Sequence, residues 1–395
     1  MEKKGVNRRA FLRISAAAGA GALVMPNATA STLHSAVVQE NENFPMRTLG
    51  RTGIQLPLLS MGVMRADNPN VVRAAYNAGI KHFDTAHGYQ NGRNEEMLGN
   101  FFKDKERNSF YIATKCKAKF PLTDDFEQSY TDMINLSLSR LQMDYVDWFY
   151  AHDLQTPEQV KDERFIALLK RFKEEGKTKF LAFSMHNHKP ELIDAAVEAG
   201  IYDVILLSYN FKLNNLKETD EAIARAAKAG IGFVAMKTMT GGAEDASGET
   251  KVNGQACLRW VWNNKHITTA IPGFTSFDML DDCMAALQAP ELTADDKQYL
   301  AALCTQEGLF CQQCGACVEQ CPQSLPIPDI MRAYMYAYGY KQAHLSKETL
   351  AELNLPKDIC ASCDSCKVNC ISGFNVAQKI ASIAPVRDMP TEFLT

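Results

Sequence analysis

The sequence contains no apolar run long enough to cross a membrane and no stripe of basic residues. A stable transmembrane helix needs about 20 consecutive apolar residues. The formal net charge is −4 at pH 7, and a mild acidic excess of this kind disfavours binding to nucleic acid. We therefore expect no stable membrane span and no nucleic-acid partner.

The amino-terminal segment differs in charge from the rest of the chain. Its first 30 residues hold five Lys or Arg and one Glu, a net of +4, which leaves −4 − 4 = −8 for the remainder. Arg8 and Arg9 precede a short apolar run from Ile14 to Met25, and Ala28-Thr29-Ala30 has the small residues of a cleavage site. The pattern resembles a twin-arginine (Tat) signal peptide. An ordinary secretory signal with an accidental arginine pair is the alternative.

From Met46 to about Ala289, short apolar runs alternate with amphipathic stretches. The runs predict strands at 58–63, 82–85, 110–115, 146–151, 180–184, 204–208, 233–236 and 269–272. Helices are expected at 69–78, 94–104, 124–141, 163–175, 190–199, 217–229, 255–264 and 276–288. Eight such units are typical of a (β/α)₈ barrel. A doubly wound sheet is the alternative, but it should carry a Gly-rich phosphate loop after its first strand, and Met61-Gly62-Val63-Met64 is not one.

Polar residues follow successive expected strands of the barrel. Asp84 lies after the second strand, Tyr89 on the loop beyond it, Lys115 ends the third strand and His152 follows the fourth. In barrels of this kind the chemistry lies at the carboxyl ends of the strands. Taken singly, Asp84 could be a helix cap, Tyr89 or Lys115 a surface side chain and His152 a core histidine, but four suitable types at the ends of three successive strands predict a catalytic site.

The local sequences around these residues resemble the aldo-keto reductases over residues 46–290. The matching motifs are Phe83–Tyr89, Asn94–Gly99, Ile112–Lys115, Tyr150–Asp153 and Ile271–Gly273. The resemblance implies reduction of a small carbonyl or oxidation of an alcohol. Tyr89 would donate the proton, an ammonium at Lys115 would favour its phenolate and so make it a stronger acid, Asp84 would hold Lys115, and His152 would orient the carbonyl oxygen.

The nicotinamide contacts depart from the family pattern. The resemblance implies contacts at Ser184, Lys237 and Gly273, but Ser184 is not followed by Asn, the sixth strand has no Gln, and Met236 stands where an aromatic residue is usual. No Lys or Arg occurs in residues 273–284 to bind the 2′-phosphate of NADP. The sequence therefore does not choose between NADP(H), NAD(H) and no nicotinamide. For an exported protein we expect any such cofactor to be tightly held from before export.

Eight of the 12 cysteines form two runs near the carboxyl end. Their spacing is typical of bacterial ferredoxins, in which the fourth cysteine ligates the other cluster. One [4Fe–4S] cluster is assigned to Cys311, Cys314, Cys317 and Cys370, and the other to Cys360, Cys363, Cys366 and Cys321. Zinc is the alternative, but structural zinc sites seldom show four cysteines in one such run.

The segment between the two cysteine runs predicts a packed helix. Met331, Tyr334, Met335 and Tyr338 fall at i, i+3, i+4 and i+7, which is more often a buried helix face than an electron relay. Helices in this insert suggest a mainly helical variant of the two-cluster ferredoxin.

The predicted organisation is a signal peptide at 1–30, a linker at 31–45, the barrel at 46–290 and the ferredoxin-like domain at 291–395. Because Tat exports folded proteins, this signal suits a cargo whose clusters are inserted before export. We expect an exported oxidoreductase, in the periplasm or another extracytoplasmic space, that passes electrons to or from a partner protein. The second hypothesis is an electron-transfer protein whose barrel is only a binding scaffold.

Overall fold

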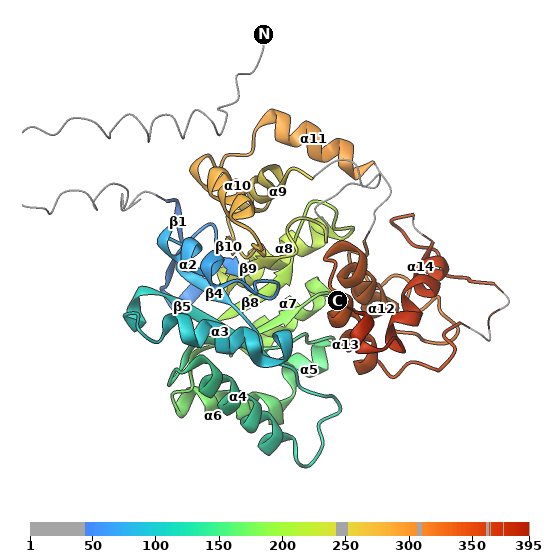
Figure 1. The fold of residues 1–395 in the computed structure, drawn as a ribbon, viewed down its shortest axis with the longest axis horizontal. Helices are drawn as coiled ribbons and strands as arrows, with labels where there is room; N and C mark the ends of the chain where they lie inside the picture. Colours follow the sequence, from blue (N-terminus) through green and yellow to red (C-terminus); the bar gives the residue numbers. More distant parts are fainter. Residues whose placement is uncertain are drawn as a thin grey trace, which may run out of the picture. The chain divides into compact units, whose positions relative to one another are not determined.

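The computed structural model describes residues 44–241, 252–305, 310–360, 363, 365–373 and 375–394. The predicted signal peptide and nearly all of the predicted linker lie outside these residues. Eight parallel strands surround the core: β3 (Met61–Gly62), β4 (His82–Asp84), β5 (Tyr111–Cys116), β6 (Val146–Ala151), β7 (Thr178–Met185), β8 (Val204–Ser208), β9 (Gly232–Met236) and β10 (Ile267–Ala270). Bridges from Leu59 to Ala270 and from Gly62 to Gly273 join the first strand to the last. The predicted (β/α)₈ barrel is therefore confirmed (Figure 1).

Helices alternate with these strands around the barrel (Figure 1). They are α2 (Pro69–Asn77), α3 (Arg93–Phe102), α4 (Phe126–Leu141), α5 (Pro157–Lys161), α6 (Glu163–Glu174), α7 (Lys189–Ala199), α8 (Leu216–Lys228), α9 (Gly254–Asn263) and α10 (Phe277–Gln288). Gly79, Gly176, Gly200 and Gly230 follow four of them with positive φ. Only glycine adopts this conformation without strain, so the sequence itself ends these helices.

A short antiparallel hairpin closes the amino-terminal end of the barrel. It consists of β1 (Met46–Thr48) and β2 (Gln55–Pro57), and the sequence patterns did not predict it. Leu49 and Leu56 are fully buried in one cluster with Trp148 and Tyr150 of the barrel interior. A Cβ at Gly50 would lie 2.3 Å from the backbone nitrogen of Gly232, so the hairpin can approach β9 only with a glycine there. With this end filled, the opposite end of the barrel is left for a binding site.

The segment after the barrel begins with α11 (Ala294–Cys304), which opens on a capping box at Thr293 and Asp296. Leu300 and Leu303 of this helix pack with Phe211 and Cys257 of the barrel. Although the predicted second domain starts at residue 291, α11 thus packs with the barrel rather than with the cysteine-bearing segment.

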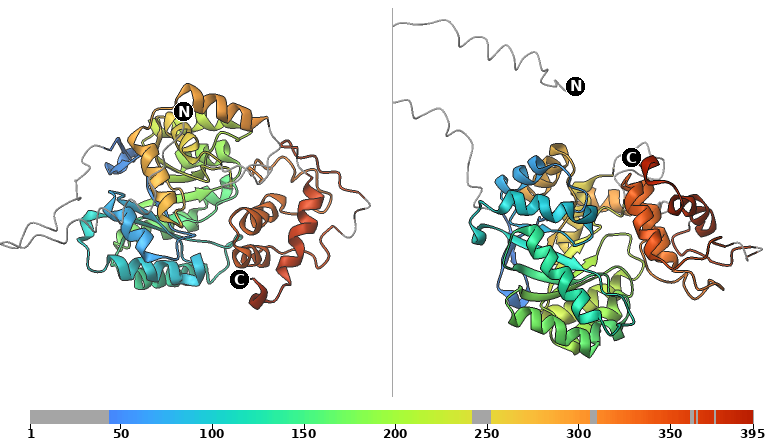
Figure 2. Two further views of the ribbon diagram at one scale, coloured as in Figure 1. Left: turned by 45° about the horizontal axis from the view of Figure 1, so that its top comes forward. Right: turned by 60° about the horizontal axis from the view of Figure 1, so that its bottom comes forward.

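The cysteine-bearing segment is mainly helical. It contains α12 (Ile327–Tyr334), a π-helical turn η4 (Met335–Gly339), α13 (Ala343–Glu352) and α14 (Val376–Ile383). Figure 2 shows these helices beside the barrel, and hydrogen bonds such as Asn210 to Gln312 join the two parts. In the described portions of the chain, every helix is too short or too polar to cross a membrane.

Candidate active site and cluster-binding cysteines

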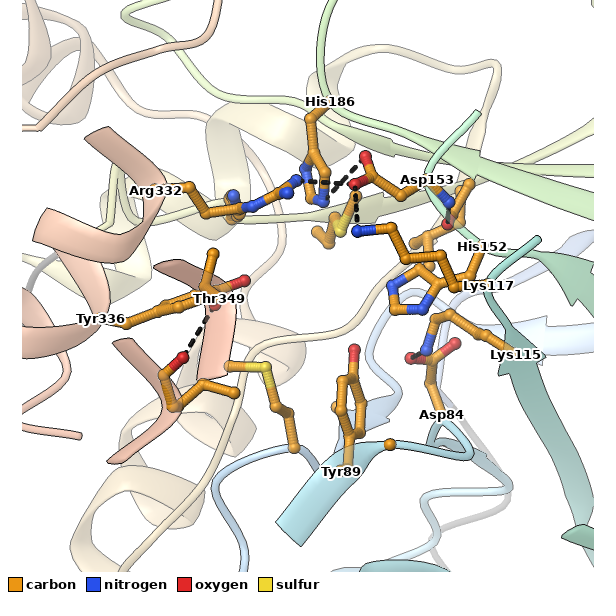
Figure 3. A pocket seen from close by; sticks show the side chains of 18 of the residues that line it. Asp84, Tyr89, Lys115, Lys117, His152, Asp153, His186, Arg332, Tyr336 and Thr349 are labelled. Carbon is orange, nitrogen blue, oxygen red and sulfur yellow. Dashed lines mark hydrogen bonds and ion pairs between the residues drawn. The ribbon is translucent and has the colours of Figure 1, made fainter. Parts of the chain in front are cut away.

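A cavity of about 1070 Å³ lies at the carboxyl ends of the barrel strands. Asp84, Tyr89, Lys115 and His152 all line it, as the sequence predicts. Their elements explain the convergence: each follows or ends one of the neighbouring parallel strands β4, β5 and β6, so their side chains meet at one edge of the sheet. Figure 3 shows the four around the same part of the cavity.

Lys115 and Asp84 form a buried ion pair beneath this cavity. The Lys115 ammonium donates to Asp84 Oδ1 at 2.6 Å and to the carbonyl oxygen of Thr85 at 2.5 Å. Both side chains are nearly inaccessible, at 2% and 3% exposure. Burial lowers the pKa of Lys115 and raises that of Asp84, while their mutual attraction opposes both shifts. The pair therefore holds Lys115 in one position.

Tyr89 projects its hydroxyl into the cavity, but its acidity differs from the prediction (Figure 3). Burial, and after it the Asp84 carboxylate, raise the pKa of the phenol well above its usual value. The Lys115 ammonium is bonded to Asp84 and lies over the face of the Tyr89 ring, 5.0 Å from the centroid. The net shift of the Tyr89 pKa is upward, opposite to the shift that the sequence predicted from Lys115.

His152 lies edge-on to Tyr89, with ring centroids 6.3 Å apart. Burial and then the nearby Lys115 charge lower the pKa of His152 to about 3. The imidazole is therefore neutral near pH 7. A neutral ring can donate one hydrogen bond to a carbonyl oxygen without itself being a proton source.

The cysteine-bearing segment supplies a wall of the cavity that sequence reasoning missed. Arg332 of α12, Tyr336 of η4 and Thr349 of α13 line it together with Tyr340. Arg332 and Tyr336 face Tyr89 and His152 across the cavity (Figure 3). Arg332, Tyr336 and Tyr340 are spaced at i, i+4 and i+8, which is the signal that could have identified this face.

The predicted stripe in this segment is only partly buried. Met331 and Met335 are 2% and 3% exposed, but Tyr338 is 42% exposed. The reason is the π-helical turn that begins at Met335, because it interrupts the α-helical period on which the prediction rests.

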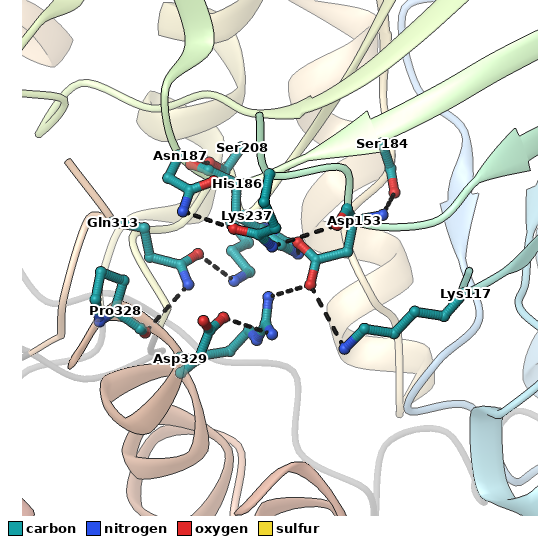
Figure 4. Close-up of polar contacts among 12 residues, drawn as sticks. Lys117, Asp153, Ser184, His186, Asn187, Ser208, Lys237, Gln313, Pro328 and Asp329 are labelled. Carbon is teal, nitrogen blue, oxygen red and sulfur yellow. Dashed lines mark hydrogen bonds and ion pairs between the residues drawn. The ribbon is translucent and has the colours of Figure 1, made fainter. Parts of the chain in front are cut away.

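Arg332 also forms a buried ionic centre with the barrel. Its guanidinium donates to Asp153 Oδ2 at 2.9 Å and pairs with Asp329 at 2.8 Å. Asp153, the residue after the predicted catalytic histidine, adopts a φ of +61° and also approaches Lys117 and His186, at 3.9 Å each. Figure 4 shows these contacts. The cysteine-bearing segment is thus tied to the backbone that carries His152.

The three predicted nicotinamide contacts lie around the cavity, and two of them are engaged by the protein. Ser184 Oγ accepts a hydrogen bond from the Asp153 backbone at 2.9 Å. Lys237 Nζ donates to Gln313 Oε1 at 3.1 Å, toward the first cysteine run (Figure 4). Gly273 follows β10 and pairs with Gly62 through the bridge that closes the barrel. Ser184 retains its own O–H as a donor.

The first predicted ligand set surrounds a small second cavity. Cys311, Cys314, Cys317 and Cys370 all line it, with Cys370 coming from the second run. Burial, and to a lesser extent the three neighbouring thiols, raise the pKa of Cys311 to about 12. The structure therefore brings together cysteines of both runs, in the set assigned from the ferredoxin spacing.

The second predicted set also gathers across the two runs. Burial and the neighbouring Cys363, Cys366 and Cys321 raise the pKa of Cys360. Within the described residues, no three Cys, His, Asp or Glu side chains converge on a point that could bind a single metal ion.

The fold and the four clustered side chains define a reductase-type barrel joined to a cluster-binding domain. The model of the aldo/keto reductase family matches residues 55–253, just over half of the chain, and the chain belongs to that family. The model of a 4Fe-4S dicluster domain matches residues 310–375, which contain all eight cysteines of the two runs. The domain match supports iron–sulfur clusters as the bound groups.

Two of the relatives are named as dehydrogenases. The chain is 26% identical over 294 residues to L-galactose dehydrogenase of Arabidopsis thaliana, covering 65% of this chain and 92% of that protein. It is 26% identical over 228 residues to D-threo-aldose 1-dehydrogenase of a Pseudomonas species, covering 48% and 68%. Among solved structures, an aldo-keto reductase from Bacillus halodurans has a TM-score of 0.54 at 21% identity, over 66% of this chain and 96% of that one. That likeness shows the fold alone.

Proposed function

We propose that this aldo-keto reductase interconverts a small carbonyl and an alcohol in the barrel cavity and exchanges electrons through two [4Fe–4S] clusters with a redox partner protein. The observation that carries the catalytic part is the convergence of Tyr89, His152 and the Lys115–Asp84 ion pair on one wall of the cavity. The observation that carries the cluster part is the gathering of the cysteines in two mixed sets.

Each side chain has a separate task in this proposal. The neutral imidazole of His152 donates a hydrogen bond to the substrate oxygen and orients it. The Tyr89 hydroxyl donates its proton to that oxygen during reduction and accepts it during oxidation. Lys115, fixed by Asp84, places a positive charge against the Tyr89 ring, so that negative charge forming on the phenol is stabilised. A bound nicotinamide would supply or accept the hydride.

The direct test is carbonyl reduction by wild type and by Tyr89→Phe, purified as residues 31–395. A general acid contributes about 10²–10⁴-fold to the rate, so we expect kcat to fall by that factor. Tyr76→Phe is a matched control, since Tyr76 does not line the cavity and its hydroxyl bonds to Ser109. Equal rates in wild type and Tyr89→Phe would overturn the catalytic proposal.

We propose sugars or related polyols as the substrate class. Two relatives are named for the oxidation of L-galactose and of D-threo-aldoses, and the cavity carries polar groups such as Gln155 and Thr238 on its walls. A panel of aldoses, sugar alcohols and apolar aldehydes at equal concentration tests this. Higher kcat/KM for the apolar aldehydes would contradict it.

A second candidate is an electron-transfer protein whose barrel binds a ligand without hydride chemistry. It is favoured by the engagement of Ser184 with Asp153 and of Lys237 with Gln313, two side chains expected at the nicotinamide. Retention of a nicotinamide during purification, together with loss of activity in Tyr89→Phe, would count against this candidate.

A further inference from the structure

Lys189 is a buried ammonium without a carboxylate partner. It is the first residue of α7, its side chain is 1% exposed, and its Nζ donates to the carbonyl oxygen of His186 at 2.6 Å. Within the parts of the chain that the structure describes, no Asp or Glu lies within ion-pair distance of it. It is also absent from the walls of the catalytic cavity, so a ligand bound there cannot neutralise it.

Lys237 is a second cation at the barrel mouth, half-buried and, among the described residues, without a carboxylate within ion-pair distance. It follows β9 with a φ of +54°. Its ammonium donates a hydrogen bond to the neutral side chain of Gln313. Burial and then the positive charge of Arg332 lower the pKa of Lys237 to about 7. Unlike Lys189, it lines the catalytic cavity.

Both ammonium groups lie close to the first cysteine set. Lys237 donates to Gln313, whose backbone N–H donates to Cys311 Sγ at 3.2 Å, and the neighbouring Cys314 and Cys311 oppose the lowering of the Lys189 pKa by burial. The backbone at Gly315 abuts the start of α7, since a Cβ there would lie 3.3 Å from the ring of His188. A buried ammonium with no counter-charge is costly. Cysteines that bind a cluster are thiolates, so a loaded cluster brings the missing negative charge to this place.

We propose that Lys189 and Lys237 are the counter-charges of the cluster held by Cys311, Cys314, Cys317 and Cys370, and that they raise its reduction potential above that of the second cluster. Reduction adds one negative charge to a cluster. A positive charge fixed nearby in a medium of low dielectric favours that reduced state, and solvent screens it little. This inference rests on the proposed clusters but not on the carbonyl chemistry.

The second cysteine set has a different environment. Cys366 is exposed to solvent, which screens the charges around it, and the pKa of Cys360 is raised by burial and by Cys363, Cys366 and Cys321. Electron transfer from the second cluster to the first is therefore favourable. In this step the second cluster is oxidised by one electron and the first is reduced by one. Because Lys237 lies both at the first cluster and on the wall of the catalytic cavity, the higher-potential cluster is the one next to the substrate.

The test is an anaerobic redox titration followed by electron paramagnetic resonance, without substrate or nucleotide. Lys189→Met removes the charge and keeps an apolar chain of similar length. We expect the higher of the two wild-type potentials to shift downward and the lower one to stay in place. Lys228→Met, on the exposed last turn of α8, is the matched control and should shift neither. Iron and sulfide analysis of each variant shows whether both clusters are present.

Two outcomes would overturn the proposal: no shift in Lys189→Met with both clusters present, or a shift of the lower potential alone. If Lys189→Met fails to hold the first cluster, Lys237→Gln is titrated in its place. If the higher potential of Lys237→Gln equals that of wild type, the proposal is likewise overturned. A wild-type protein that contains no clusters would instead refute the proposed function, so the two failures are distinguishable.

Discussion

At the residue scale, the environment of His152 decides what it can do. The histidine lies between the Lys115 ammonium and the ionic centre at Asp153, and burial keeps its ring neutral. A catalytic histidine with an ordinary pKa near 6.5 would titrate inside the range in which enzymes are assayed. His152 would not, because its pKa is lowered to about 3.

This gives a prediction for His152 variants. Removing a hydrogen-bond donor to a developing oxyanion costs about 10²–10³ in kcat, so we expect a loss of that size in His152→Leu and a smaller loss in His152→Gln, which keeps a donor. Because His152 is neutral from pH 5 to pH 8, the profile of log kcat/KM in this range should keep its shape in His152→Gln. A wild-type inflection near pH 6.5 that disappears in this variant would show that His152 titrates during catalysis.

The residue types of the tetrad were predictable, whereas their chemistry was not. Asp84 and Lys115 could be identified because they occupy the ends of β4 and β5, and strand ends are visible in the sequence. The pKa of Tyr89 depends on whether the ammonium meets its oxygen or its ring, a difference of a few ångströms. Arg332 was missed because its partner, Asp153, lies 179 residues away in the chain.

At the element scale, helices and buried strands were well predicted because their signals are local. Strand β6 and helix α4 end where expected, and α7 ends against a glycine of positive φ. The hairpin of β1 and β2 was missed because strands of three residues are too short to show a period. Tyr338 was wrongly expected to be buried, because no local pattern predicts the π-helical turn in which it lies.

The ion pair between α12 and the loop after β6 yields a second prediction. Arg332→Met leaves the Asp153 carboxylate, which is 4% exposed, without its closest cation. Removal of one partner from a buried pair typically costs about 3–5 kcal/mol. We expect this loss in the denaturant unfolding of the transition that includes α12. Since removal of both charges is often nearly neutral, Arg332→Met combined with Asp153→Asn should recover part of it, because Asn tolerates the positive φ while Asp329 still lacks its cation.

The same pair should make the protein sensitive to acid in a defined direction. Burial raises the pKa of Asp153, but Arg332 and then Lys117 together lower it by more. The folded-state pKa therefore lies below the usual value near 3.9. The stabilisation is therefore fully present above about pH 4 and is lost as the pH falls through the lowered value. The free energy of unfolding is measured at pH 6 and at pH 3 for wild type and for Arg332→Met. If both lose the same amount, the Asp153 carboxylate does not supply this acid dependence.

At the scale of the whole molecule, the predicted export route fits the way in which the two parts are joined. The cysteine-bearing segment completes the wall of the catalytic cavity through Arg332 and Tyr336. Such a cavity exists only after both parts have folded together. A route that accepts folded proteins suits this order of events.

The export route can be tested at the arginine pair. We expect Arg8→Lys together with Arg9→Lys to leave the protein in the cytoplasm with its clusters intact, because a twin-arginine signal is read as a receptor address. The measurement is the distribution of protein and bound iron between cell fractions. Undiminished export of the double variant would favour the ordinary secretory signal.

The last prediction concerns the connection between the barrel and the clusters. Residues 31–395 are purified without oxygen, and the visible spectrum is recorded before and after addition of NADPH or NADH, with dithionite as the reference for full reduction. Because Lys237 lies at both the cavity and the first cysteine set, we expect the nucleotide to bleach part of the cluster absorbance. A nicotinamide releases two electrons as hydride whereas a cluster accepts one, so bleaching would direct the search to a group that divides the pair. Full bleaching by dithionite with none by either nucleotide would contradict the prediction and favour the electron-transfer scaffold, in which the two centres work with separate partners.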